Sequence, residues 1–287
     1  MIPGGTPDAR RAPDHETLWC ASCQDRTVQT ALSDALTACG RAPHDTVIVT
    51  GSGCAGQFPH NLSVYGIQGV HGRVLPTALG VKLANPDLTV IAVTSGPFGF
   101  SAESGFLPYL ARQNVDLVSL YLEDPPPDVF ATATPPEFTG SSPAVAAPVN
   151  PLRDLGADLS LGCGADVSFV ARGYSGQPEE LRRLFTTAIQ HVGTAVVQVL
   201  APCRFLRSPS ELEAISARCA PLPVADPTDD LGTAIARVTS RSPFWLGRFR
   251  CQERPALDRQ LASGSERLAT DPDLTAVWRR IRNVNRT

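Results

Sequence analysis

The chain has 287 residues, of which 43% are hydrophobic and 18% charged, so it is long enough to bury a large core. Its formal net charge of −3 gives no basic excess of the kind that nucleic-acid or membrane-surface proteins carry. The sequence contains no apolar run near the roughly 20 residues that cross a bilayer and nothing resembling a signal peptide. We therefore expect a cytoplasmic protein that binds neither nucleic acid nor membrane.

The first half of the chain alternates helical and strand patterns after a Pro-, Gly- and Arg-rich start, which we interpret as a flexible tail over residues 1–17. Apolar residues recur at helical spacing from Val28 to Cys39, and Gly40 ends the pattern. Thr46–Thr50 is a β-branched run typical of a buried strand, and the glycine-rich turn Gly51-Ser-Gly-Cys54 follows it. Further along, we expect helices over 75–85 and 102–113 and strands over 88–93 and 115–122.

The second half begins with a proline-rich stretch over 123–151 that has no clear period and predicts a long loop. A regular pattern then returns, with expected strands over 167–171 and 194–200 and expected helices over 178–191, 209–217, 229–239 and 267–282. Helices that alternate with almost wholly apolar strands predict an α/β fold with a mostly parallel sheet covered on both faces. We assign 18–260 to this domain and 261–287 to a C-terminal helical extension.

Eight cysteines in a chain of this length do not suggest a small disulfide scaffold, and in a reducing compartment they are metal ligands, reactive thiols or core residues. Cys20 and Cys23 form a C-x2-C pair, a spacing that suits zinc, an iron–sulfur cluster or a redox dithiol. Cys54 and Cys203 each follow an expected strand, so both turns could lie at the carboxyl edge of one sheet. The four thiolates would then be the ligand set of a [4Fe–4S] cluster.

The competing interpretation is that Cys54 and Cys203 are small buried hydrophobic residues, as free cysteines often are. Spacing alone does not choose between the two. The remaining cysteines have no metal-like spacing, and we interpret them as core residues: Cys39, Cys163, Cys219 and Cys251.

Several short motifs in register resemble the β-subunit family of 2-oxoacid:ferredoxin oxidoreductases over residues 18–260. The matching stretches are Trp19-Cys-Ala-Ser-Cys23, Gly51-Ser-Gly-Cys54, His71-Gly-Arg73 with 75–86, Phe169-Val-Ala-Arg-Gly173, Ala201-Pro-Cys203 and Glu253-Arg-Pro255. The resemblance implies a thiamine diphosphate-binding fold.

The same resemblance assigns site residues. It makes Cys20, Cys23, Cys54 and Cys203 the ligands of a [4Fe–4S] cluster. It also puts four further residues beside thiamine diphosphate: Gly53, His71, Gly72 and Arg73. A glycine-rich turn lets backbone N–H groups approach phosphate, and a His or Arg adds charge-assisted hydrogen bonds. The alternative for His71 is a structural histidine held by hydrogen bonds.

The sequence departs from the family at the magnesium motif, where Mg²⁺ prefers hard oxygen ligands in octahedral geometry. Gly96, Pro97 and Phe98 stand where the family has Asp-Gly-Asp, and Glu123-Asp124 stand where it has Asn-Asn. Asp124 is the remaining candidate ligand for Mg²⁺, with Ser95 as a possible hydroxyl. The alternative is that Glu123 and Asp124 are solvated loop acids.

The function that the resemblance implies is oxidative decarboxylation of a 2-oxoacid to acyl-CoA, with electrons passing through the cluster to ferredoxin. An α-type subunit would complete the active site, so the expected partners are that subunit, ferredoxin, a 2-oxoacid and coenzyme A. A second hypothesis is a non-catalytic homologue that keeps the cluster as an electron-transfer or assembly module but has lost Mg²⁺ and thiamine diphosphate. A third is a structural zinc site with four cysteine ligands.

Overall fold

The structure is a computed structural model that describes residues 17–262 except for 96–102, 104, 125–158, 160–161, 206, 224–226 and 241. The expected N-terminal tail, the proline-rich loop and the C-terminal helical extension lie largely outside the described residues. The expected helix over 267–282 lies wholly outside them.

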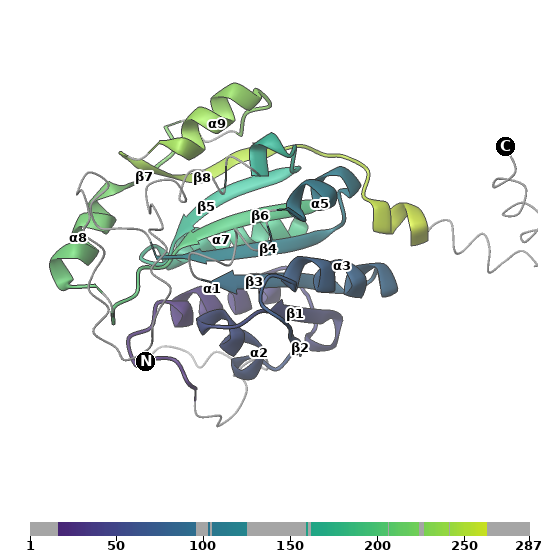
Figure 1. Ribbon diagram of the computed structural model, residues 1–287, viewed down its shortest axis with the longest axis horizontal. Helices are drawn as coiled ribbons and strands as arrows, with labels where there is room; N and C mark the ends of the chain where they lie inside the picture. The colour runs from purple at the N-terminus through teal and green to yellow at the C-terminus, as the bar shows by residue number, and fades with distance from the viewer. Residues whose placement is uncertain are drawn as a thin grey trace, which may run out of the picture.

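An eight-stranded sheet forms the centre of the molecule (Figure 1), in the order β2-β1-β3-β4-β6-β5-β8-β7. The six strands from β2 to β5 in this order are parallel, β8 runs antiparallel to β5, and β7 is parallel to β8. The strand bounds are β1 Thr46–Thr50, β2 Tyr65–Gln68, β3 Thr89–Ser95, β4 Leu117–Glu123, β5 Phe169–Tyr174, β6 Thr194–Leu200, β7 Cys219–Pro221 and β8 Phe244–Cys251.

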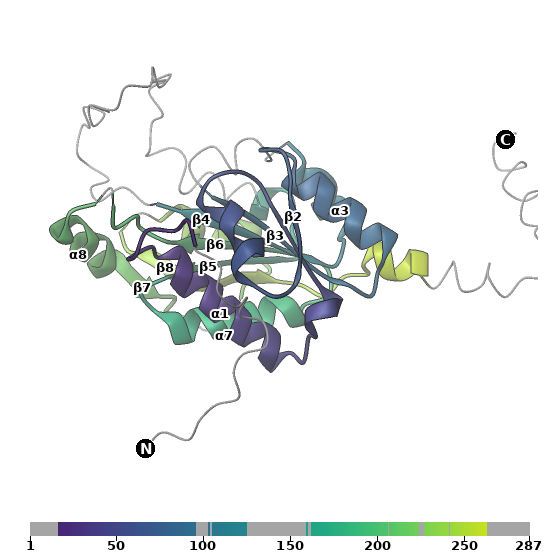
Figure 2. The ribbon, with the colours of Figure 1, turned by 90° about the horizontal axis from the view of Figure 1, so that it is seen from below.

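Helices cover both faces of this sheet, which confirms the predicted fold class. On one face α1 and α7 lie side by side (Figure 2), and on the other α3, α5 and α9 pack against the strands. The helix bounds are α1 Asp25–Ala38, α2 Phe58–Asn61, α3 Val74–Ala84, α5 Leu107–Gln113, α7 Pro178–Gln190, α8 Pro209–Arg218 and α9 Leu231–Thr239, with short 3-10 helices at Pro43–Asp45 and Cys54–Gln57.

The apolar patterns explain why most of these elements form where the sequence predicts them. β1, β4 and β6 are buried along their whole length, as strands covered on both faces must be. The predicted stop at Gly40 is also confirmed, because Gly40 takes a left-handed φ of 65° directly after the α1 C-cap.

Three strands escaped the sequence patterns. All four residues of β2 are exposed, since β2 is an edge strand, so it has no alternation of apolar and polar residues. In β8 the arginines at 248 and 250 hide the strand pattern, and the strand is irregular opposite Val170 and Ala171. β7 has only three residues.

The order of the strands reverses beside β1. The chain passes from β1 to β2 on one side and then crosses back to β3 on the other side. At such a reversal the loops that follow the two central strands diverge, and open α/β sheets bind their ligands there. The carboxyl ends of β1 and β3 are therefore the first region in which to look for a site.

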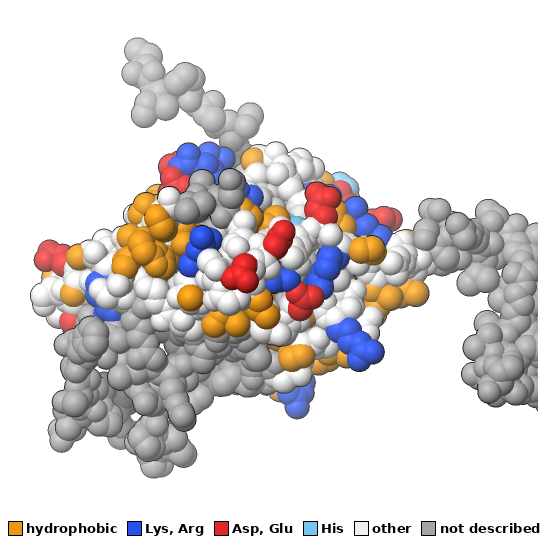
Figure 3. Space-filling view, turned by 90° about the horizontal axis from the view of Figure 1, so that it is seen from above, with side chains coloured by type: hydrophobic (Ala, Val, Ile, Leu, Met, Phe, Trp, Pro, Cys, Tyr) orange, Lys and Arg blue, Asp and Glu red, His pale blue; other side chains and the backbone are white. Residues whose placement is uncertain are grey.

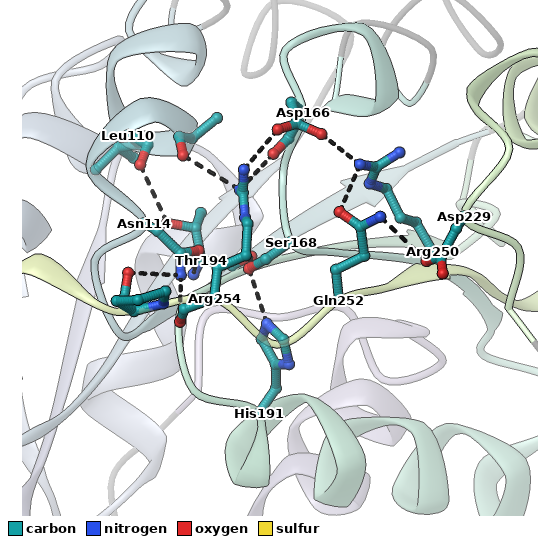
Figure 4. A network of polar contacts seen from close by, with 12 residues as sticks. Leu110, Asn114, Asp166, Ser168, His191, Thr194, Asp229, Arg250, Gln252 and Arg254 are labelled. Carbon is teal, nitrogen blue, oxygen red and sulfur yellow. Dashed lines mark hydrogen bonds and ion pairs between the residues drawn. The ribbon is translucent and has the colours of Figure 1, made fainter.

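The opposite edge of the sheet, where the parallel strands begin, holds a polar network (Figure 4). Asn114 accepts a hydrogen bond from Thr194 N at 3.1 Å and donates one to the carbonyl of Arg254 at 3.0 Å. The Arg254 guanidinium and that of Arg250 both pair with Asp166. The segment after β8 is thereby fixed to the end of the sheet at which the parallel strands begin.

On the face that carries α9, acidic and basic side chains are interspersed among the described residues (Figure 3), in line with the small net charge. Within the described ranges, no helix is long and apolar enough to cross a membrane.

Candidate functional site

The C-x2-C segment forms a tight loop directly ahead of α1. Cys23 N donates to the carbonyl of Cys20 at 3.0 Å, and Arg26 N donates to the carbonyl of Cys23 at 3.3 Å. The Arg26 guanidinium also donates to the carbonyls of Trp19 at 3.3 Å and Cys20 at 3.4 Å. The loop is therefore held by backbone hydrogen bonds and by the Arg26 side chain, and neither thiol is used in a disulfide.

Trp19 connects this loop to the turn that carries Cys54. Its indole Nε1 donates to the carbonyl of Cys54 at 2.8 Å. The indole also packs edge-on against Phe58, with 5.3 Å between the ring centroids. Because Trp19 is buried, this contact brings the C-x2-C loop beside the end of β1.

Cys203 follows β6 on a loop that Asp124 holds from the neighbouring strand β4. Cys203 N donates to Asp124 Oδ1 at 3.1 Å. Arg207 donates to both carboxylate oxygens of Asp124, at 3.2 and 3.1 Å, and its backbone N donates to the carbonyl of Cys203 at 3.0 Å. This two-pronged ion pair fixes the position of Cys203 at the carboxyl edge of the sheet.

The eight cysteines differ in their exposure. Cys54 is exposed, so the interpretation of it as a buried hydrophobic residue is wrong, whereas Cys203 is half-buried. The cysteines that we interpreted as core residues do pack against the core clusters. Cys163 is fully buried, and the half-buried members of this set are Cys39, Cys219 and Cys251.

The thiols of the four predicted ligands act on one another electrostatically. Burial raises the pKa of Cys23 to about 12, and negative charge on Asp25, Cys54 and Cys20 adds to the effect. Partial burial also raises the pKa of Cys54, as do the charges of Asp25, Cys203 and Cys20. These thiols lie close enough for the charge on one to affect the pKa of another. A bound metal would favour their deprotonated form.

The four thiols are not gathered around one point. Among the described residues, no three His, Cys, Asp or Glu side chains converge closely enough to hold a metal ion. A structural zinc site requires such convergence on one ion. A [4Fe–4S] cluster attaches each cysteine to a different iron, so its ligands lie further apart. The observed donor set is chemically suited to a cluster, and the ligand role of the four cysteines stays a prediction.

The glycine turn after β1 lies beside the carboxyl end of β3. Gly53 has a φ of 81°, and a Cβ at this position would lie 3.4 Å from the hydroxyl oxygen of Ser95, at the end of β3. The same hydroxyl accepts a hydrogen bond from Ala55 N at 3.1 Å. The left-handed φ favours glycine, and the exposed backbone of the turn leaves room for a ligand to approach.

The His71-Gly72-Arg73 segment lies against this turn. His71 Nδ1 and the hydroxyl of Ser52 are 3.1 Å apart. Gly72 has a φ of 73°, and the Arg73 guanidinium donates to the Gly72 carbonyl at 2.7 Å. The two segments that the sequence singled out are thus neighbours. The hydrogen bond of His71 suits both its predicted role and the structural alternative, so cofactor binding by Gly53, His71, Gly72 and Arg73 stays a prediction.

The magnesium motif is only partly visible, because Gly96, Pro97 and Phe98 lie outside the described residues. Glu123 is buried at the end of β4, so the idea that it is a solvated acid is wrong for that residue. Asp124 is a candidate Mg²⁺ ligand whose oxygens already accept hydrogen bonds from Arg207 and Cys203. Its magnesium role stays a prediction that requires these bonds to exchange.

Several residues that build the site have little or no signal in the sequence. For Trp19, the only sequence signal was its position directly before the C-x2-C pair, and its hydrogen bond to Cys54 could not be predicted. Arg207 lies after β6 and pairs with Asp124, which follows β4, so no local sequence pattern indicates the contact. Glu103 is 1% exposed, and its Oε1 accepts a hydrogen bond from Val74 N at 2.8 Å. Burial raises the pKa of Glu103 to about 7.

Comparison with known proteins gives one matching family model and several relatives. Residues 51–199 match the family model described as thiamine pyrophosphate enzyme, C-terminal TPP binding domain. The β subunit of 2-oxoacid:ferredoxin oxidoreductase 1 from Aeropyrum pernix is 33% identical over 187 residues, a match that spans 64% of this chain and 58% of that relative. The β subunit of a 2-oxoacid:ferredoxin oxidoreductase from Sulfolobus sp is 27% identical over 240 residues, covering 80% of this chain and 79% of the relative.

A solved structure supports the fold. The 2-oxoglutarate:ferredoxin oxidoreductase from Magnetococcus marinus, solved with 2-oxoglutarate, coenzyme A and succinyl-CoA bound, superposes with a TM-score of 0.77 at 24% identity. The superposition covers 94% of this chain and 93% of that one. The likeness extends over nearly the whole chain and establishes a shared architecture.

Proposed function

Because this chain belongs to the thiamine pyrophosphate enzymes through the C-terminal TPP binding domain at residues 51–199, we propose that it is the β-type subunit of a 2-oxoacid:ferredoxin oxidoreductase. The β subunits among its relatives support this assignment. In the proposed complex an α-type subunit completes the active site. The reaction is oxidative decarboxylation of a 2-oxoacid to acyl-CoA, with ferredoxin as the electron acceptor.

The observation that carries the proposal is the placement of cysteines from three separate segments: Trp19 Nε1 ties the C-x2-C loop to the Cys54 carbonyl at 2.8 Å, and Asp124 holds Cys203 N at 3.1 Å at the end of the neighbouring strand β6. Cys20, Cys23, Cys54 and Cys203 would hold a [4Fe–4S] cluster, which supplies one-electron transfer when bound. Asp25 N, which bonds to Cys23, provides a donor near one of the sulfurs. Hydrogen bonds to cluster sulfurs are one of the means by which a protein sets the reduction potential.

The second part of the proposal concerns thiamine diphosphate, which supplies carbanion stabilisation when bound. The backbone at Gly53 and Gly72 would meet the diphosphate, and His71 and Arg73 would provide charged or polar donors. Asp124 is the described carboxylate that remains a candidate ligand for Mg²⁺. To take that role it would have to exchange its bonds with Arg207.

The non-catalytic alternative is not favoured, because the relatives are named as subunits of oxidoreductases. The zinc alternative receives no support from the described side chains, which do not converge on one ion. Gly96, Pro97 and Phe98 replace the usual magnesium motif, so binding of thiamine diphosphate is the part of the proposal to test directly.

The test is to purify the chain anaerobically with its α-type partner and quantify iron, sulfide, zinc and thiamine per chain. The proposal expects about four irons with matching sulfide, together with thiamine diphosphate. About four irons without thiamine, even with excess thiamine diphosphate and Mg²⁺, would contradict the catalytic function and favour the electron-transfer module. Stoichiometric zinc without sulfide would contradict both.

A further inference from the structure

Glu103 caps a helix from a distant part of the sequence. Its Oε1 accepts a hydrogen bond from Val74 N at 2.8 Å, and Leu75 N also donates to the carboxyl group. Val74 is the first residue of α3, and the side chain of the preceding residue, Arg73, makes no capping bond within the described helix. Glu103 therefore satisfies backbone donors that the helix cannot satisfy itself.

The capped end of α3 is where the two glycine-rich segments of the candidate site meet. Val74 directly follows His71-Gly72-Arg73, and its Cγ2 lies 3.2 Å from where a Cβ on Gly51 would be. On the other side of this contact, Ser52 meets His71 at 3.1 Å. A displacement of Val74 would therefore move the His71-Gly72-Arg73 segment relative to the turn after β1.

The backbone of Glu103 is hydrogen-bonded to the start of α5. Its backbone carbonyl accepts a hydrogen bond from Phe106 N at 2.8 Å, directly before α5. Of the charged groups described, Arg73 is the one whose charge acts on this carboxyl, and burial outweighs that effect. Among the residues that the structure describes, Oε2 of Glu103 has no hydrogen-bond partner although it is buried. A buried carboxyl oxygen without a hydrogen-bond partner lowers the stability of the folded protein. The hydrogen bond of the other oxygen, Oε1, to the start of α3 offsets part of this cost.

We propose that Glu103 is a positioning residue of the cofactor site, whose carboxyl group holds the start of α3 so that the preceding His71-Gly72-Arg73 segment keeps its contact, through His71, with the turn after β1. The inference rests on the proposed function, because the ligand concerned is thiamine diphosphate. Glu103 acts through Val74, so its removal changes cofactor affinity by freeing the backbone at 71–75.

The experiment compares three variants of the full chain, purified with its α-type partner. Glu103→Ala removes the acceptor, Glu103→Gln keeps a carbonyl acceptor for Val74 N, and Glu213→Gln on α8 is an exposed control. Calorimetry with thiamine diphosphate and Mg²⁺ gives the dissociation constant. Hydrogen exchange of the peptide covering 71–79, measured without cofactor, reports on the start of α3 independently of binding.

The proposal expects Glu103→Ala to weaken cofactor binding about tenfold, which corresponds to about 1.4 kcal/mol, and to speed exchange in 71–79. Glu103→Gln should restore slow exchange and most of the affinity, and Glu213→Gln should match the wild type. If Glu103→Ala binds the cofactor as tightly as the wild type does, this inference is overturned but the proposed function is not. A wild-type complex that binds no thiamine diphosphate would overturn the proposed function and this inference with it.

If Glu103→Ala does not fold, the Glu103→Gln variant carries the test through its pH profile. We expect cofactor affinity of the wild type to depend on pH near neutrality and that of Glu103→Gln to lose this dependence, because the titrating carboxyl group is gone. An identical pH profile in both proteins would count against the inference.

Discussion

The indole N–H of Trp19 donates a hydrogen bond to the carbonyl oxygen of Cys54 across 2.8 Å, and so ties the two earliest cysteine segments together. Trp19→Phe keeps an aromatic ring against Phe58 but loses this bond. We expect a loss of about 0.5–1.5 kcal/mol in the free energy of unfolding and a lower iron content per chain. Denaturant titration and iron analysis measure these two effects. Trp245→Phe, on β8, is the matched control, and equal iron loss in both variants would contradict a specific role for Trp19.

The ligand set is tested by removing one thiol at a time. Cys203→Ala should abolish the visible absorption of the anaerobically purified protein and reduce its iron content, because a cluster lacking one of four thiolates is poorly held. Cys251→Ala, a half-buried cysteine outside the proposed set, should leave both unchanged. Colour and iron that persist in Cys203→Ala would show that the proposed ligand set is wrong.

Variants of Asp124 and Arg207 can distinguish two possible roles of the Asp124 carboxylate, which are anchoring the Cys203 loop and binding Mg²⁺. If Asp124 anchors the Cys203 loop, Asp124→Asn and Arg207→Gln should both reduce iron content, since each breaks the same ion pair. If Asp124 instead binds Mg²⁺, Asp124→Asn should weaken binding of thiamine diphosphate with Mg²⁺ while Arg207→Gln does not. Because the pair is partly exposed, we expect a coupling energy of only about 1 kcal/mol in a double-mutant cycle.

Glu103 predicts a pH dependence of stability. Its pKa rises from 4.5 to about 7 on folding, so the folded protein holds this proton more tightly than the unfolded chain does. Stability should therefore fall as pH rises from about 4.5 to about 7 and then level off. Asp25, whose pKa burial raises to about 6, acts in the same direction.

The contribution of Glu103 is isolated by comparing the free energy of unfolding of wild type and Glu103→Gln between pH 5 and 8, as denaturant titration measures it. The wild type should lose up to about 3 kcal/mol more than the variant over this range. Parallel curves for the two proteins would contradict the raised pKa.

The sequence was a reliable guide where burial and periodicity coincide. TVIVT at β1 and TAVVQVL at β6 are buried throughout and form strands over the predicted residues. β8 was missed because an antiparallel neighbour needs no helical crossover, and its arginines interrupt the apolar pattern. β2 was missed because an exposed edge strand leaves no pattern of burial.

The candidate site divides in the same way. Motifs that are local in sequence, such as C-x2-C and the glycine turn, could be identified from the residues that form them. The contacts that fix those motifs could not, because they join distant segments. Asp124 meets Arg207 only when β4 and β6 are neighbours, and Glu103 meets Val74 across a separation of 29 residues in the sequence.

The Asp124 clamp on the Cys203 loop has a consequence for biosynthesis. Cys20, Cys23 and Cys54 leave the ribosome long before β6 has been translated, and Cys203 reaches them only after β6 has joined β4 in the sheet. If these four cysteines hold the proposed cluster, the nascent chain must keep the first three thiols reduced until β6 has been made. Loading of the proposed four-cysteine centre would then be a late maturation step, performed on a chain whose sheet is already assembled.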